Sequence, residues 1–94
     1  MRPANIRALC ALEELNVLRR APALLPLLLE NGLRLEDAMA LAHNATLLFY
    51  ALDVPEDERP PSPRGVLEIF SLAEIAALCE EAESLAVTRK GDKE

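Results

Sequence analysis

The sequence predicts a small all-α protein, and three observations support that prediction. Hydrophobic residues make up 51% of the chain, mostly Leu and Ala, whereas aromatic residues make up only 3%. Because Leu and Ala favour helices and strand-favouring residues are scarce, the composition is biased towards helix. Apolar residues also recur at three- and four-residue intervals. The 94 residues suffice for one domain, which predicts a small orthogonal bundle of three main helices plus one short proline-bounded helix.

The first predicted helix spans residues 4–20 and follows Pro3, a residue that suits a helix start. Six apolar residues at helical spacing are expected to face the core: Ile6, Leu9, Cys10, Leu12, Leu15 and Leu18. The short second helix spans residues 22–31, with Pro22 in its first turn and Asn31-Gly32 as a left-handed stop. Because it is apolar on all sides, we expect cover from several directions, part of it from another chain.

The third predicted helix spans residues 35–52 and has two faces. The centre of its apolar face holds Ala38, Leu41, Ala45, Leu48 and Leu52. The opposite side gathers Glu36, Met39, His43 and Tyr50, with Leu47 on its border. This second face is therefore expected to be mixed in character, as surfaces that contact other proteins often are.

Residues 53–65 contain four Pro and several charges, which predicts an extended loop near polyproline II. Residues 66–70 are expected to be an apolar strap in extended conformation. The last helix is predicted over residues 72–87, because Ser71 and Glu74 form a capping box and Phe70 and Ile75 have the spacing of a hydrophobic staple. Residues 1–88 thus form the single domain, and residues 89–94 a frayed polar tail.

The net charge of −6 argues against binding to nucleic acid or to anionic membranes, which require clustered Lys and Arg. No apolar run is long enough to span a membrane and no targeting segment is visible, so we expect a cytoplasmic protein. Cys10 and Cys79 lack Cys or His neighbours at ligand spacing, so no zinc site, other metal or cofactor is expected. Both are expected to be small buried hydrophobic residues.

His43 is the only histidine and the only candidate for acid–base chemistry near neutral pH. Catalysis would require a nucleophile or an orienting carboxylate within hydrogen-bond range, and on its own helix Glu36 and Tyr50 are each two turns away. We therefore expect a protein that is not an enzyme. The alternative, an enzyme or ligand-binding domain using His43, requires a pocket with a carboxylate brought in from the first or the last helix.

The remaining evidence favours a noncatalytic protein-interaction or assembly module that binds a protein partner or forms a homo-oligomer. Leucine-rich and Met- or Tyr-containing surfaces suit such contacts. Eight residues are the candidate partner-binding set: Leu24, Leu25, Leu27, Leu28, Met39, His43, Leu47 and Tyr50. A second alternative is a small acidic regulatory protein, similar to an antitoxin, that binds a basic partner.

The capped segment FSLAEIAALCEE, residues 70–81, carries the one resemblance to a known family. This segment, and the layout of a small acidic all-helical chain, resemble small phage proteins of the tail-assembly chaperone type. The resemblance implies a noncatalytic protein that holds another protein during assembly. It assigns no functional residue in this sequence.

Overall fold

The computed structural model describes residues 5–92, with side chains described as far as residue 85. Its elements are α1 (Ala11–Arg20), the 3₁₀ turn η1 (Ala21–Leu24), α2 (Leu25–Glu30), α3 (Leu35–Ala51), the 3₁₀ turn η2 (Glu56–Glu58), α4 (Pro63–Ile69) and α5 (Leu72–Asp92). No strand forms within these residues, where a single isolated bridge joins Ile6 to Leu52. The predicted all-α bundle is confirmed.

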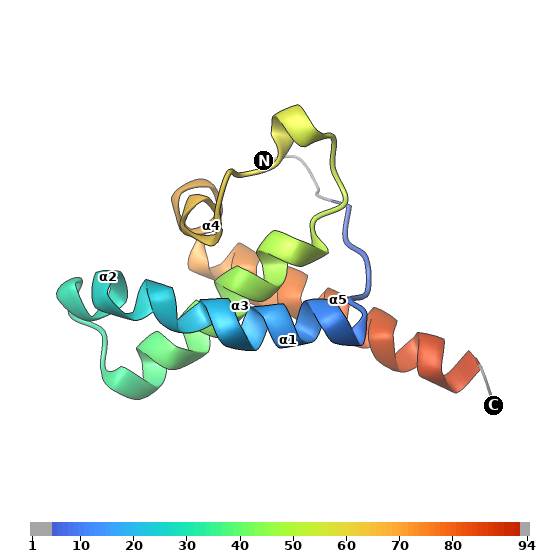
Figure 1. Ribbon diagram of the computed structural model, residues 1–94, viewed down its shortest axis with the longest axis horizontal. Helices are drawn as coiled ribbons and strands as arrows, with labels where there is room; N and C mark the ends of the chain where they lie inside the picture. The colour runs from blue at the N-terminus through green and yellow to red at the C-terminus, as the bar shows by residue number, and fades with distance from the viewer. Residues whose placement is uncertain (1–4, 93–94) are drawn as a thin grey trace.

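Helix α3 is the centre of the bundle. It packs against α1, η1, α2, α4 and α5, and Figure 1 shows the other elements arranged around it. Its buried face is rich in alanine, which lets neighbouring helices approach closely: Ala38, Ala42, Ala45, Leu48 and Ala51 are all at most 1% exposed. Thr46 is also buried, and its hydroxyl donates to the carbonyl oxygen of Ala42 at 2.8 Å. The predicted bounds of this helix, 35–52, match the observed ones within one residue.

Helices α1 and α2 form one rod, joined by η1. The backbone stays in the right-handed helical region at Arg20, Ala21, Leu24 and Leu25, and Figure 1 shows the rod running across α3. Because a proline has no N–H and its ring crowds the preceding turn, Pro22 tightens the rod into a 3₁₀ turn rather than ending it. The rod ends at Gly32, whose φ of 93° is the predicted left-handed stop.

The prediction of a helix from residue 4 is wrong, because α1 begins only at Ala11. Residues 5–10 run alongside the end of α3 instead: the N–H of Arg7 donates to the Ala51 carbonyl at 3.0 Å, and that of Asp53 to the Asn5 carbonyl at 2.8 Å. These backbone bonds compete with the helical ones that the sequence pattern implied.

A second anchor for this segment is the ion pair of Arg7 with Glu13 on α1. The hydrogen bond from Arg7, together with one from the Cys10 backbone N–H, lowers the pKa of Glu13 to about 2. Cys10 is exposed at the start of α1, so the expectation that it is buried is also wrong.

Two further corrections concern residues 53–70. The predicted extended loop and strap contain a helix, α4, which begins at Pro63 after Ser62 in extended conformation. Proline suits the first helical turn, so Pro63 starts this helix rather than prolonging a polyproline segment. Gly65 lets α4 approach the preceding chain closely, because a Cβ there would lie 2.9 Å from the Cβ of the buried Pro60.

Helix α5 starts as predicted. Glu74 accepts a hydrogen bond from the Ser71 backbone N–H at 2.9 Å, and its own N–H donates to the Ser71 hydroxyl at 3.1 Å, which completes the capping box. Phe70 and Ile75, the predicted staple pair, both lie in the core. The backbone stays helical to Asp92, beyond the predicted end of the helix at residue 87; the rest of the predicted polar tail, residues 93–94, lies outside the described part of the chain.

Candidate protein-binding surface

Three leucines of α1 are largely exposed. Leu12, Leu15 and Leu18 are 68%, 61% and 64% exposed, and we call them the leucine face. The rod instead buries a series spaced four, three and four residues apart: Val17, Ala21, Leu24 and Leu28. Since successive helix residues are about 100° apart, one rod cannot bury both series. The prediction that the leucines face the core is therefore wrong.

An apolar hollow lies beside the leucine face, between the rod and α3. Its volume is about 170 Å³. The lining residues, apolar except for the histidine, are Leu18, Ala21, Pro22, Leu25, Met39, Ala42 and His43. An apolar cavity of about 150 Å³ holds a benzene molecule, so this hollow has room for one large apolar side chain of a partner.

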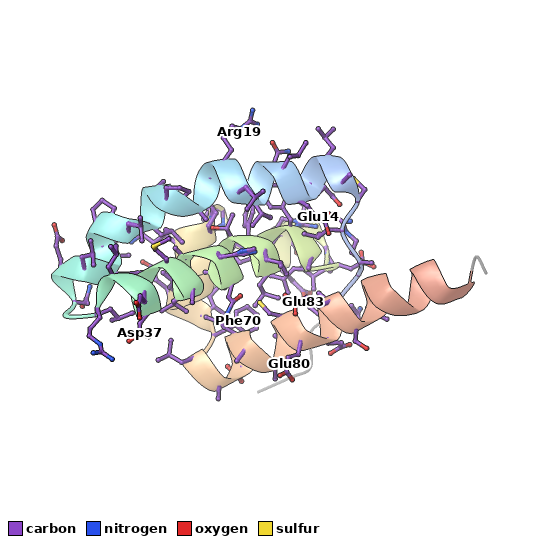
Figure 2. The ribbon with its side chains drawn as sticks, turned by 90° about the horizontal axis from the view of Figure 1, so that it is seen from below. Glu14, Arg19, Asp37, Phe70, Glu80 and Glu83 are labelled. Atoms are coloured by element: carbon purple, nitrogen blue, oxygen red, sulfur yellow. The ribbon has the colours of Figure 1, made fainter. Side chains whose placement is uncertain are left out.

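A second hollow of about 210 Å³ continues from the first, sharing Leu18 and His43 with it. It lies where α1, α3 and α5 meet, and its lining is Leu9, Glu14, Val17, Leu18, His43, Leu47 and Glu83. Figure 2 shows Glu14 on α1 and Glu83 on α5 on the same side of the molecule, flanking α3. Together the two hollows form one groove, apolar at the α2 end and flanked by carboxylates at the α5 end.

His43 lies where the two hollows meet. Glu14 of α1 and Glu83 of α5 line the second hollow with it, and the enzyme alternative required a carboxylate from one of these two helices. Within the part of the chain whose side chains are described, however, its ring makes no hydrogen bond and no carboxylate lies within 4.0 Å of it to form an ion pair. The same residues include no group of three His, Cys, Asp or Glu side chains able to hold a metal ion.

The structure brings four of the eight predicted partner-binding residues to the groove, where Leu47 lines the second hollow. Leu25, Met39 and His43 line the apolar hollow, with Met39 more than half exposed. Leu27 lies at a different hollow, described below. Tyr50 is half-buried, and its hydroxyl accepts a hydrogen bond from Arg20 at 2.9 Å.

Leu24, Leu28 and Leu47 are at least 92% buried in the chain's own core, although Leu47 also lines the second hollow. The all-round apolar pattern of the second helix is thus explained by internal packing for two of its leucines. No cover by another chain is required for them.

A second exposed apolar region lies around α4 and the start of α5, where Ile69 and Leu72 are each more than half exposed. The adjacent hollow of about 380 Å³ is lined by Leu27, Leu28, Asn31, Leu41, Arg64, Leu67, Glu68 and Leu72. The side chains of Arg64 and Glu68 pair at 3.5 Å on its wall. Because its lining includes Asn31, Arg64 and Glu68, this hollow is less apolar than the first hollow beside the leucine face, whose only polar lining residue is His43.

Sequence reasoning missed the leucine face and both groove carboxylates. One signal for the leucine face was available, namely a second apolar series whose burial would leave the leucines exposed: Val17, Ala21, Leu24 and Leu28. This series can be recognised only if the helix is continued through Pro22. No local signal pairs Glu14 with Glu83, because they are far apart in the sequence.

Comparison with known proteins gives no assignment: no family model, no curated protein and no solved structure matches this chain. Among the described residues, no helix has both the length and the apolar character required to cross a membrane.

Proposed function

We propose that this protein is a noncatalytic interaction module that binds a helix of a protein partner along the leucine face and the adjacent groove. The observation that carries the proposal is the exposure of Leu12, Leu15 and Leu18 beside an apolar hollow. Contiguous exposed apolar surface next to a groove is typical of protein-binding sites. An amphipathic helix is a natural occupant, because its apolar residues recur at the spacing of the leucines.

The energetics indicate that the hollow must take part. Fully burying a leucine contributes about 1.5–3 kcal/mol, and these side chains are already about one third covered, so covering them adds roughly 3–6 kcal/mol in total. Association itself costs at least about 4 kcal/mol. The leucine face alone would therefore give a weak complex. A partner side chain that fills the hollow between Leu25 and Met39 supplies the additional burial.

A pair of double variants tests this proposal. Leu15→Gln with Leu18→Gln removes two of the three residues of the leucine face, and Ile69→Gln with Leu72→Gln disrupts the second apolar region as a matched control. Both pairs are exposed, so circular dichroism should show an intact helical fold in each. Proteins that co-purify with the tagged chain from its source cells would be identified by mass spectrometry.

We expect a partner that binds the wild type and the Ile69/Leu72 variant but is lost from the Leu15/Leu18 variant. Retention by both variants, or loss from the Ile69/Leu72 variant alone, would place binding elsewhere and contradict the proposal.

Three further proposals accompany this one. A role in holding another protein during assembly, like that of tail-assembly chaperones, is supported by the exposed leucine face. The net charge of −6 favours a protein partner over nucleic acid or an anionic membrane. The unpaired thiols of Cys10 and Cys79 suit the reducing cytoplasm.

A further inference from the structure

The charges around the groove carry an inference about the partner's chemistry, which rests on the proposed function. Glu14 and Glu83 line the same hollow from two different helices. Within the described side chains, neither carboxylate accepts a hydrogen bond or forms an ion pair. By contrast, Glu13, the neighbour of Glu14 in the sequence, is fully engaged by Arg7. The groove thus presents two carboxylates that no side chain described in residues 5–85 neutralises.

The arginines near this surface are committed elsewhere. Arg20 donates to the Tyr50 hydroxyl, and its guanidinium lies 5.4 Å from the centre of the Phe49 ring. Arg19 is hydrogen-bonded to Asn16, and Figure 2 shows it pointing away from the side on which Glu14 and Glu83 lie. Among the side chains that the structure describes, no Lys or Arg lines the acidic end of the groove.

The walls below the two carboxylates are apolar. Leu9, Val17 and Leu47 line the same hollow. A lysine or arginine side chain matches this combination, because its aliphatic stem packs on apolar walls while its charged head stays near carboxylates. At the other end of the groove, the hollow beside Met39 matches an apolar side chain.

We propose that the groove binds a basic amphipathic helix of another protein. Its apolar residues cover the leucine face and fill the first hollow, and a Lys or Arg about two turns along reaches between Glu14 and Glu83. A second copy of this chain fits less well, because its own groove would bring the same two carboxylates against them. The overall charge of −6 also favours a basic partner and speeds encounter with it.

Selection from a peptide library tests this proposal. The library displays 18-residue amphipathic helices with a fixed leucine stripe, and its flanking positions vary among Lys, Glu and Gln. It also includes the chain's own residues 11–30. Selection is run on the wild type and on the Leu15→Gln, Leu18→Gln variant, so that only peptides dependent on the leucine face are scored.

We expect leucine-dependent binders to be enriched in Lys. Enrichment in Glu, or no charge preference, would overturn the basic-partner inference and leave the proposed function standing. Enrichment of the chain's own segment would assign the groove to a second copy and also overturn it. No leucine-dependent binder at all would overturn both.

Charge variants give the quantitative check with a selected lysine peptide. Removing both groove carboxylates, Glu14→Gln with Glu83→Gln, should weaken binding about fivefold and reduce its salt dependence, as expected for two partly exposed ion pairs. The matched control, Glu80→Gln with Glu81→Gln, removes the same charge from exposed positions of α5 outside the groove. Equal weakening by both pairs would show a general charge effect and contradict the proposed contact.

Discussion

Replacing Val17 and Leu15 separately tests which face of α1 packs on the bundle. Val17 is 1% exposed, and Val17→Ala removes two buried carbons, each contributing about 0.8 kcal/mol. A residual cavity adds to this loss, while the better helix propensity of alanine offsets part of it, so we expect destabilisation by about 1.5–2 kcal/mol. Leu15 is 61% exposed, and Leu15→Gln exchanges one helix-favouring residue for another. We expect a change within about 0.5 kcal/mol.

Urea denaturation followed by far-ultraviolet circular dichroism measures both values on the same scale. The comparison is informative because the spacing of leucines in the sequence favours the opposite result. If Leu15→Gln destabilised the protein as much as Val17→Ala, the leucines would face the core. The leucine face, and with it the proposed binding surface, would then be refuted.

Three other predictions follow from local contacts. Because the folded pKa of Glu13 is about 2, below its ordinary 4.5, its ion pair stabilises the protein above pH 4.5 and is lost as the pH falls towards 2. Glu13→Gln should therefore cost about 1 kcal/mol at pH 7 and almost nothing near pH 2 in urea titrations, whereas an equal cost at both would exclude the pair as the cause. Gly65→Ala should lower stability by about 1–3 kcal/mol in thermal melts, because the new Cβ would meet the rigid ring of Pro60. An unchanged melting temperature would show that α4 is free to shift. A thiol reagent, with labelling followed by mass spectrometry, should react rapidly with the exposed Cys10 and with Cys79 only on unfolding. Burial, with a smaller effect of a nearby carboxylate, raises the pKa of Cys79 to about 12. Rapid labelling of both thiols would contradict the burial of Cys79.

Local signals predicted those elements whose ends are specified by their own residues. The capping box at Ser71 and Glu74 marked the start of α5, and Gly32 marked the end of α2. The burial of Cys79 was predicted correctly, and its thiol donates to the Asn44 carbonyl at 3.1 Å. The two helix ends are decided by residues close in sequence. The burial of Cys79 follows from its place on the apolar face of one regular helix.

Predictions were wrong where contacts beyond a single helical turn decide the structure. Residues 5–10 are extended because they bond to the backbone around Ala51, a contact that no helical spacing reveals. The segment after Pro63 is helical, and its Gly65 packs closely against Pro60. The proline-rich, charged composition of this region predicted a loop and gave no sign of that contact. Val17 is buried instead of Leu15 because the rod continues through Pro22. The predicted first helix ended before this proline, so the longer series of buried residues was missed.

The candidate site was predictable only in part for the same reason. The mixed face of α3 pointed to Met39 and His43, and both line the groove. The opposite wall comes from Leu18 on α1, whose exposure depends on the face that the rod buries. The carboxylate of Glu83 arrives from α5, so its position requires the tertiary packing.

Photo-crosslinking from position 15 tests the central claim most directly, because it reports what contacts the leucine face in the source cells. A photoreactive amino acid would replace Leu15, and the same group at the exposed position of Glu81 on α5 serves as control. We expect a single heterologous adduct from position 15, absent from position 81 and lost when Leu18→Gln is added. The mass spectrum of the adduct should place the crosslink in a basic helix. No adduct from position 15, or an adduct formed equally from both positions, would contradict the assignment of the leucine face as the binding surface.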